Sequence, residues 1–278
     1  MNIYLASGNS HKGRELAAIL AGHRVILPAA AGISRFDPEE TGASFAENAL
    51  IKARALHRLL AEARAGSAVP ARPAAFGDFS IPARPAENPA ALAGEFAVLG
   101  EFAVLADDSG LCVDILGGRP GIYSARYRGA AAAPGAGSGP PEGGPELTSA
   151  ERNALLLEEA AAALRARNPA AAVPDGAKLR CRFVCAMALF FDADRFYLVQ
   201  ETLEGELTPR IEAARGSGGF GYDPIVYLPE RGRTVAELTE EEKNRCSHRG
   251  KAGRAIARLL ATDIAAKVPG RAAGIPGF

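Results

Sequence analysis

Several segments of the chain combine glycine with hydroxyl or charged side chains, the residue types that bind phosphate and divalent cations. The segment Ser7 to Lys12 follows a short apolar run and precedes a helical pattern. A helix N-terminus carries free N–H groups and partial positive charge, which suit a phosphate, and Lys12 adds a full charge. The segment is too short for a Walker A loop. Taken alone, it also fits an Asn- or Ser-capped helix with a solvent lysine.

Two acidic segments, Glu39 to Gly42 and Asp107 to Gly110, each end in a glycine turn. A strand predicted over 102–106 delivers the second segment to its carboxyl end, where ligands bind in open α/β sheets. Carboxylates there suit Mg²⁺, which shares its coordination shell with phosphates and water. Because neighbouring strand residues point to opposite faces, Asp107 and Asp108 should have different roles. The alternative is an Asx-type turn after a strand.

Two segments near the C-terminus could recognise a base and further anions. The glycine-rich loop 216–224 holds two aromatics and a carboxylate, and an aromatic face can stack on a nucleobase. Segment 241–250 brings Lys, His and Arg together, although a solvated charged turn is an equal interpretation. Only six of the 32 Lys and Arg residues are Lys. Retaining Lys12 and Lys243 in these candidates favours a need for a compact ammonium.

Intermixed strand and helix patterns must position these groups. Strands are predicted over 2–6 and 25–27, and a hairpin over 180–191 and 195–204 turns at 192–194. Helices are predicted over 11–21, 44–64, 148–165 and 250–261. The second opens with a capping box of Ser44 and Glu47 and continues with an apolar stripe. The expected fold class is α/β (α+β mixed), a long mixed sheet flanked by helices.

The length and composition of the chain are typical of a soluble globular protein. It has 278 residues, a net charge of +0 and 48% hydrophobic residues. Balanced charge argues against a nucleic-acid partner. No apolar run is long enough for a membrane span, and the N-terminus does not resemble a signal peptide. The four cysteines are expected to be reduced thiols, as in a cytoplasmic protein.

Three stretches rich in Ala, Pro and Gly, near 65–93, 130–145 and 167–176, are interpreted as inserts. Their composition cannot bury enough apolar surface to offset the entropy of ordering them. Chemistry-bearing segments lie on both sides of each stretch. The inserts are therefore expected to be surface loops of a single domain over 1–278.

Together, and in order, these motifs resemble the inosine triphosphate pyrophosphatase family. The matching text is SGNSHKGREL at 7–16, EETGASFAENALIKARAL at 39–56, VLADDSGLCVDILGGRPGIYSARYRG at 104–129, RFVCAMAL at 182–189, GGFGYDPIVYLP at 218–229 and TVAELTEEEKNRCSHRGKA at 234–252. The resemblance implies two lobes with a central cleft, a homodimer, and Mg²⁺-dependent hydrolysis of ITP, dITP and XTP to the nucleoside monophosphate and pyrophosphate.

The resemblance also assigns roles to residues. It implies Glu39 and Asp108 as the magnesium carboxylates, with Glu40 as a close second candidate, and Asp108 as proton acceptor for the attacking water. The implied substrate contacts are Ser7, Gly8, Asn9, Ser10, His11, Lys12, Ser109, Phe220, Gly221, Tyr222, Asp223, Lys243, His248 and Arg249. Two alternatives stay open: a related nucleotide pyrophosphatase with another base preference, and a non-catalytic nucleotide-binding protein.

Overall fold

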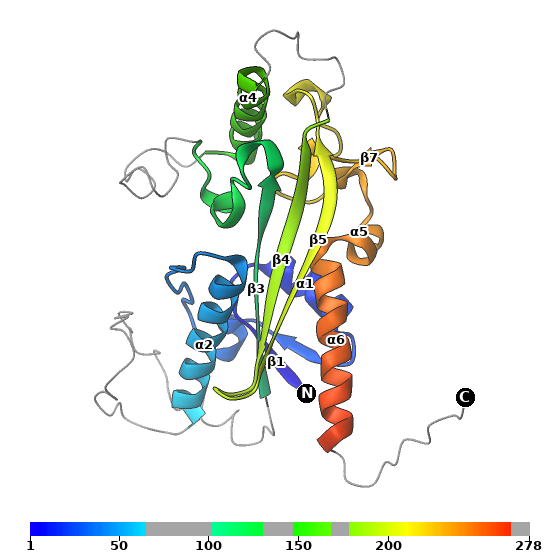
Figure 1. The fold of residues 1–278 in the computed structure, drawn as a ribbon. Coiled ribbons are helices and arrows are strands. Elements are labelled where there is room, and N and C mark those ends of the chain that lie inside the picture. The colour runs from blue at the N-terminus through cyan, green and yellow to red at the C-terminus, as the bar shows by residue number, and fades with distance from the viewer. Residues whose placement is uncertain (65–101, 130–146, 168–177, 268–278) are drawn as a thin grey trace.

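The computed structural model describes residues 1–64, 102–129, 147–167 and 178–267. Within them, a mixed sheet in the order β2-β1-β3-β4-β5-β6-β7 is flanked by helices, which confirms the predicted fold class (Figure 1). The predicted inserts near 65–93 and 130–145 lie outside the described residues, as does the insert near 167–176 except for Arg167. The assignment of a single domain over 1–278 stays a prediction.

The principal elements follow in chain order. They are β1 (Asn2–Leu5), α1 (Ser10–Ile19), β2 (Arg24–Ile26), α2 (Phe45–Arg64), β3 (Phe102–Val113), α4 (Ser149–Arg167), β4 (Arg180–Phe190), β5 (Phe196–Leu207), β6 (Val226–Leu228), β7 (Arg233–Thr234), α5 (Glu240–Cys246) and α6 (His248–Lys267). Each predicted helix and strand has a counterpart within a few residues, with one important exception.

The exception is β3, which was predicted to end at Ala106 but continues to Val113. Its first residues pair in parallel with β1, and from Val104 onward it pairs antiparallel with β4. The segment from Asp107 to Gly110 is therefore strand, and the predicted glycine turn is wrong. Gly110 instead allows a close approach, because a Cβ there would lie 2.4 Å from the carbonyl oxygen of Gly121.

Helices cover both faces of the lower part of the sheet (Figure 1). The apolar stripe of α2 packs on one face, where Val104 and Ala106 of β3 point. Helices α1 and α6 pack on the other, against Ala103 and Leu105. The alternation along β3 thus divides the lower core into two clusters.

Helix α2 begins as its sequence predicts, with one change in the cap. The N–H of Glu47 donates to Ser44 Oγ at 3.2 Å. The carboxylate of Glu47 accepts from the N–H of Ala43, not from that of Ser44. Both bonds satisfy groups at a helix start that would otherwise lack partners.

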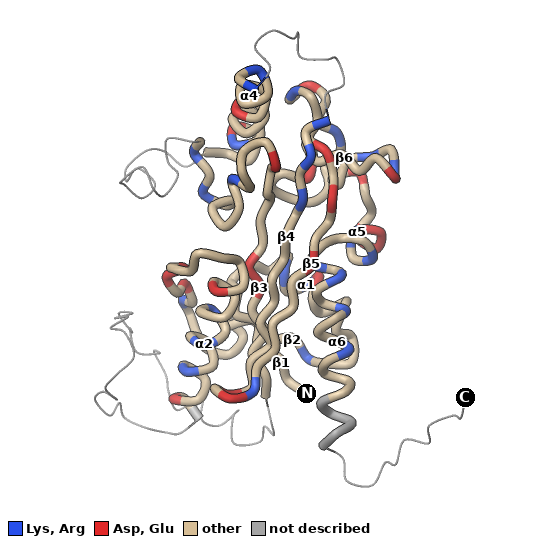
Figure 2. Tube along the Cα trace, viewed as in Figure 1, with Lys and Arg blue, Asp and Glu red and all other residues tan. Residues whose placement is uncertain are grey.

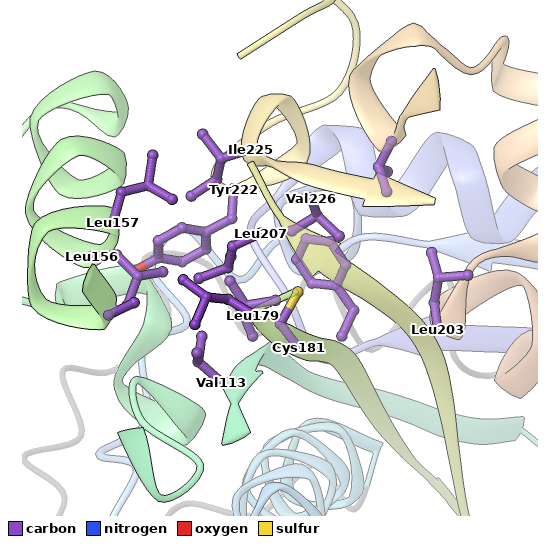
Figure 3. Close-up of a cluster of buried hydrophobic side chains, with 14 of the residues drawn as sticks. Val113, Leu156, Leu157, Leu179, Cys181, Leu203, Leu207, Tyr222, Ile225 and Val226 are labelled. Atoms are coloured by element: carbon purple, nitrogen blue, oxygen red, sulfur yellow. The ribbon is translucent and has the colours of Figure 1, made fainter. Parts of the chain in front are cut away.

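A third cluster of buried side chains fills the upper lobe (Figure 3). It joins Leu156 and Leu157 of α4 to Cys181 and Leu203 of the β4–β5 hairpin and to the segment around Ile225. The hairpin itself is antiparallel from Arg180 to Leu207, as predicted. Since β3, β4 and β5 run through both lobes, they fix how the segments of one lobe face those of the other.

Charge is distributed over both lobes. Lys and Arg are interspersed with Asp and Glu over the described chain (Figure 2). None of the helices that the structure describes has the length and hydropathy to cross a bilayer.

Candidate active site

The first part of the site is a buried ion-pair cluster on the α1/α6 face of β3. The Asp107 carboxylate is fully buried, and its Oδ2 lies 3.0 Å from Lys12 Nζ and 3.3 Å from Arg249 Nε. Arg249 also reaches Glu15 at 2.9 Å and donates to Ser109 Oγ at 3.0 Å. The cluster thus joins α1, β3 and the first turn of α6.

Charge pairing outweighs burial in this cluster. Burial alone would raise the pKa of Asp107, but Lys12 and Arg249 lower it far below its usual value. Burial would lower the pKa of Arg249, but Asp107 and Glu15 raise it. Asp107 and Arg249 are therefore ionised at neutral pH, and the Asp107 carboxylate holds both Lys12 and Arg249 in place before any substrate binds.

The phosphate-loop candidate precedes α1. Asn9 is the N-cap of α1, and its Oδ1 accepts from the N–H groups of His11 at 2.9 Å and Lys12 at 3.3 Å. Ser7 Oγ accepts from the N–H of Asn9. Gly8, Asn9, Ser10 and His11 are exposed. Because Asn9 already satisfies two N–H groups, an anion bound here would interact mainly with Lys12 and the positive helix end.

The second part of the site lies on the opposite face of β3. Asp108 Oδ1 is 3.0 Å from Lys52 Nζ, and Asp108 Oδ2 accepts from Asn48 Nδ2 at 3.2 Å. Lys52 Nζ is also 3.0 Å from Glu40 Oε1. Asp107 and Asp108 therefore have separate partners on separate faces, which confirms the sequence argument from strand alternation.

Burial dominates the protonation of Asp108. It raises the pKa of Asp108, with Glu40 adding to the rise, although Lys52 and Asn48 oppose it. For Lys52, burial would lower the pKa, but Asp108, Asp107 and Glu40 raise it. A carboxyl group with a raised pKa next to a fixed ammonium can accept a proton more readily than an exposed aspartate.

The two neighbouring glutamates differ in position. Glu40 contacts Lys52 and lies 4.0 Å from Arg126 Nη2. Glu39 is exposed and makes no contact with the site residues that the structure describes. Sequence reasoning left both open as metal ligands. The geometry brings only Glu40 close to Asp108, and these two residues form a carboxylate pair around Lys52.

The donor set fits a divalent cation that is shared with a phosphate ligand. No group of three or more His, Cys, Asp or Glu side chains among the described residues is arranged to hold a metal ion. Glu40 and Asp108, however, both point at the Lys52 ammonium, so two carboxylates already face one cation. Mg²⁺ commonly takes one or two carboxylates and completes its shell with phosphates and water.

The third part of the site is the loop that carries Phe220. The Phe220 ring is 47% exposed, with Lys243 Nζ 4.7 Å and Arg249 Cζ 5.5 Å from its centroid. Asp223 Oδ2 accepts from the Phe220 N–H at 2.8 Å and pairs with Lys243 at 2.7 Å. An exposed ring with two cations close to it offers a stacking surface for an aromatic ligand of negative overall charge.

Four predicted substrate contacts have buried side chains: Asp223 and Arg249, whose ion pairs are given above, and Tyr222 and His248. Tyr222 lies in the upper core, where its hydroxyl donates to the carbonyl oxygen of Ser124 at 2.9 Å (Figure 3). His248 is buried and stacks on Phe183 with centroids 4.9 Å apart. Burial, followed by the charges of Arg249 and Lys243, lowers the pKa of His248 well below its usual value. Its imidazole is therefore neutral at pH 7.

These parts form one connected network. Lys243 contacts the Phe220 ring, which contacts Arg249, and Arg249 pairs with the same Asp107 oxygen as Lys12. Asp108 is the next residue of β3 and leads through Lys52 to Glu40. Segments from position 12 to position 249 thus meet along the middle of β3.

Three polar residues of this network were not singled out from the sequence. They are Glu15, Asn48 and Lys52. A signal for two of them existed: Asn48 and Lys52 are four apart and lie beside the apolar stripe of a helix, where buried polar groups need a partner. Glu15 carried no such signal, because acidic residues in helices are ordinarily on the exposed face and nothing in the sequence marks this one as different.

A cavity of about 620 Å³ borders the carboxylate side of the site. Ser44, Phe45, Tyr123, Arg126 and Gln200 are among the residues that line it. Neither Lys12 nor Phe220 does so. Arg126, which lines the cavity, also lies close to Glu40, so the cavity adjoins Glu40. It is not the space between the phosphate-loop and base-loop candidates.

Comparison with known proteins agrees with the geometry. The model of the Ham1 family matches residues 3–69 and 83–259. A dITP/XTP pyrophosphatase from Treponema denticola is 41% identical over 94% of this chain and 98% of its own length. One from Thermus thermophilus is 36% identical over 92% of this chain and 90% of its own.

Solved structures are similar as well. A HAM1 protein from Coxiella burnetii superposes with a TM-score of 0.61 at 29% identity, covering 94% of this chain and 99% of its own. A nucleoside-triphosphatase / dITP/XTP pyrophosphatase from Mycobacterium abscessus has a TM-score of 0.52 at 30% identity, covering 94% and 99%. The family match spans most of the chain and includes every segment of the network, so this chain belongs to the Ham1 family.

Proposed function

We propose that the chain hydrolyses non-standard purine nucleoside triphosphates (ITP, dITP and XTP) to the nucleoside monophosphate and pyrophosphate, and that it requires Mg²⁺. The observation that carries the proposal is the connected network along β3, which joins a lysine-bearing helix start, a carboxylate pair and an exposed aromatic ring. These are the three groups needed to bind a triphosphate, activate water and hold a base. The curated relatives carry the same activity in their names.

The triphosphate would lie beside β3, between Lys12 on one face of the strand and Lys52 on the other. Lys12 can exchange its contact with Asp107 for phosphate oxygens, because Arg249 remains to balance the aspartate. Phosphoryl-type transfer needs positioned charge more than covalent help. When bound, Mg²⁺ would neutralise charge on the phosphate oxygens, with Glu40 and Asp108 as its protein ligands.

Asp108 would accept the proton of the attacking water. Its raised pKa favours the proton-accepting role, and the ammonium of Lys52 holds the carboxylate in a fixed orientation. The proton moves from water to Asp108 Oδ1 or Oδ2 as the oxygen attacks the phosphorus atom joined to the sugar. The bond that breaks is the anhydride to the leaving pyrophosphate.

The base would stack on Phe220. Lys243 and the neutral His248 lie in the segments around this ring, and Asp223 holds both the loop and Lys243. A donor directed at the 6-oxo group of hypoxanthine or xanthine would reject adenine, since adenine leaves that donor unpaired. The site residues predicted from the resemblance, including Ser109 beside Arg249, belong to this proposal.

A panel of triphosphates with product identification, run with and without Mg²⁺, tests the proposal. We expect ITP, dITP and XTP to give monophosphate and pyrophosphate, and ATP and GTP to be poor substrates. A preference for a pyrimidine would point to a related pyrophosphatase with another base. Nucleotide binding without turnover would point to the non-catalytic alternative.

The adjacent glutamates provide a matched pair of variants for the metal. Glu40→Gln should raise the Mg²⁺ concentration that gives half-maximal rate, because it removes a proposed ligand. Glu39→Gln should leave that concentration unchanged, since Glu39 is exposed and away from the carboxylate pair. The reverse result would assign the metal to Glu39.

The homodimer and the cytoplasmic location stay predictions from the resemblance and from cysteine use. Among the described residues all four cysteines are free, which is usual in a reducing compartment. Light scattering of the purified chain would test the dimer.

A further inference from the structure

A buried asparagine of α4, which is not part of the network along β3, holds the backbone of the proposed base loop. Asn153 lies on α4, and its Nδ2 donates to the carbonyl oxygen of Gly221 at 3.1 Å. It is the only polar residue among the four buried residues described for α4; the others are Leu156, Leu157 and Ala160. The bond joins segments 68 residues apart in the sequence.

Asn153 is not there for packing alone. Its Oδ1 is buried and has no hydrogen-bond partner among the described residues. An unpaired buried polar atom costs stability, so an apolar side chain of similar size would suit this face of α4 better. The amide cannot be turned to relieve this cost, because the Gly221 carbonyl only accepts and needs the nitrogen facing it.

The loop needs such a constraint. Gly219 and Gly221 both have positive φ, at 76° and 64°, and glycine leaves the backbone more conformational freedom than any other residue. On the Gly219 side, Asp223 holds the Phe220 N–H. On the Gly221 side, the tethers are Asn153 and the Tyr222 hydroxyl bond to Ser124.

The Asn153 bond also sets the direction of a peptide. In a trans peptide the C=O and the next N–H point in opposite directions, so holding the Gly221 carbonyl toward α4 directs the Tyr222 N–H away from α4. That N–H has no acceptor within the part of the chain that the structure describes. It remains available as a donor in the loop that carries the exposed Phe220 ring.

We propose that Asn153 is a positioning residue for base recognition: it orients the Gly221–Tyr222 peptide and thereby the loop that receives the base. The inference rests on the proposed function, because it takes the Phe220 loop as the base site. It goes beyond that function by placing part of the specificity on α4, a helix that contributes none of the groups in the network along β3.

Kinetics with a base-free competitor separate this role from a purely structural one. In Asn153→Ala and Asn153→Leu we expect KM for ITP to rise about fivefold, the equivalent of one lost neutral hydrogen bond, with kcat within about twofold of wild type. The inhibition constant of inorganic tripolyphosphate, which has no base, should stay unchanged. Glu158→Ala, at an exposed position of the same helix, serves as the control.

Stability measurements keep the test valid if one variant is weakened. Asn153→Leu removes the unpaired Oδ1 and should be at least as stable as Asn153→Ala. An unfolded fraction lowers the apparent kcat and leaves KM unchanged, so a rise in KM in both variants cannot come from unfolding. An unchanged KM for ITP in active Asn153 variants would overturn this inference and leave the proposed function standing. So would an equal rise in KM for ITP and in the inhibition constant of tripolyphosphate. A wild-type chain that hydrolyses none of the nucleotides would overturn the proposed function and this inference together.

Discussion

Replacing Asp107 by asparagine removes a buried negative charge that contacts both Lys12 and Arg249. The side chains of Asp107 and Arg249 are 0% and 1% exposed, so neither solvent nor counter-ions can replace the lost charge. Breaking a buried ion pair on one side costs about 3–5 kcal/mol. Because Glu15 still pairs with Arg249, we take the lower end, about 3 kcal/mol.

The neighbouring residue provides the contrast. In Asp108→Asn the stability should stay within about 1 kcal/mol of wild type, since burial already disfavours the ionised form of Asp108 and Lys52 keeps Glu40. Turnover, however, should fall by about 10² to 10⁴, the usual effect of losing a general base. Two adjacent aspartates are thus expected to fail in different ways, because they lie on opposite faces of β3.

Urea unfolding at pH 7.5, followed by circular dichroism, measures the stability of both variants, and initial rates with ITP measure turnover. For Asp107→Asn the loss corresponds to a melting temperature lower by about 10 °C. An Asp107→Asn variant as stable as wild type, or an Asp108→Asn variant that loses more stability, would refute the reasoning.

Three further predictions follow from the same contacts. Lys52→Met should lower kcat for ITP at least about a hundredfold with a smaller change in KM, because it removes a positive charge fixed beside Asp108; a kcat within twofold of wild type contradicts this. Phe220→Leu should raise KM for ITP about tenfold by removing a stacking surface, and should leave the inhibition constant of tripolyphosphate unchanged; equal changes in the two would place the base elsewhere. The pKa of His248 is lowered well below 6.5, so below pH 6.5 the unfolded chain takes up a proton that the folded chain does not. The free energy of unfolding therefore decreases as the pH decreases, by up to about 1.4 kcal/mol per pH unit. His248→Gln should therefore make the urea midpoint less dependent on pH between pH 7.5 and 5.5. An unchanged pH dependence of the midpoint would argue against a buried neutral imidazole.

Local sequence determined the elements that form through near neighbours. The Ser44–Glu47 cap and the stripe at helical spacing predict α2, and the turn at 192–194 between two apolar runs predicts the β4–β5 hairpin. Motif order along the chain predicts the family, because glycines, carboxylates and lysines at fixed spacing identify the segments without any knowledge of their packing. Strand alternation alone was enough to predict that Asp107 and Asp108 lie on opposite faces of β3.

Tertiary structure alone decided where those segments meet. The strand through Asp107 continues because β4, about 80 residues later, pairs with it from Val104 to Val113, and no local pattern carries that information. The choice of Glu40 over Glu39 as the partner of Lys52, and the burial of Tyr222 in the upper core, likewise depend on residues far away in the sequence. So does the bond from Asn153 to Gly221, because hydrogen bonds and ion pairs between distant segments form only after the packed core has brought them within about 3 Å.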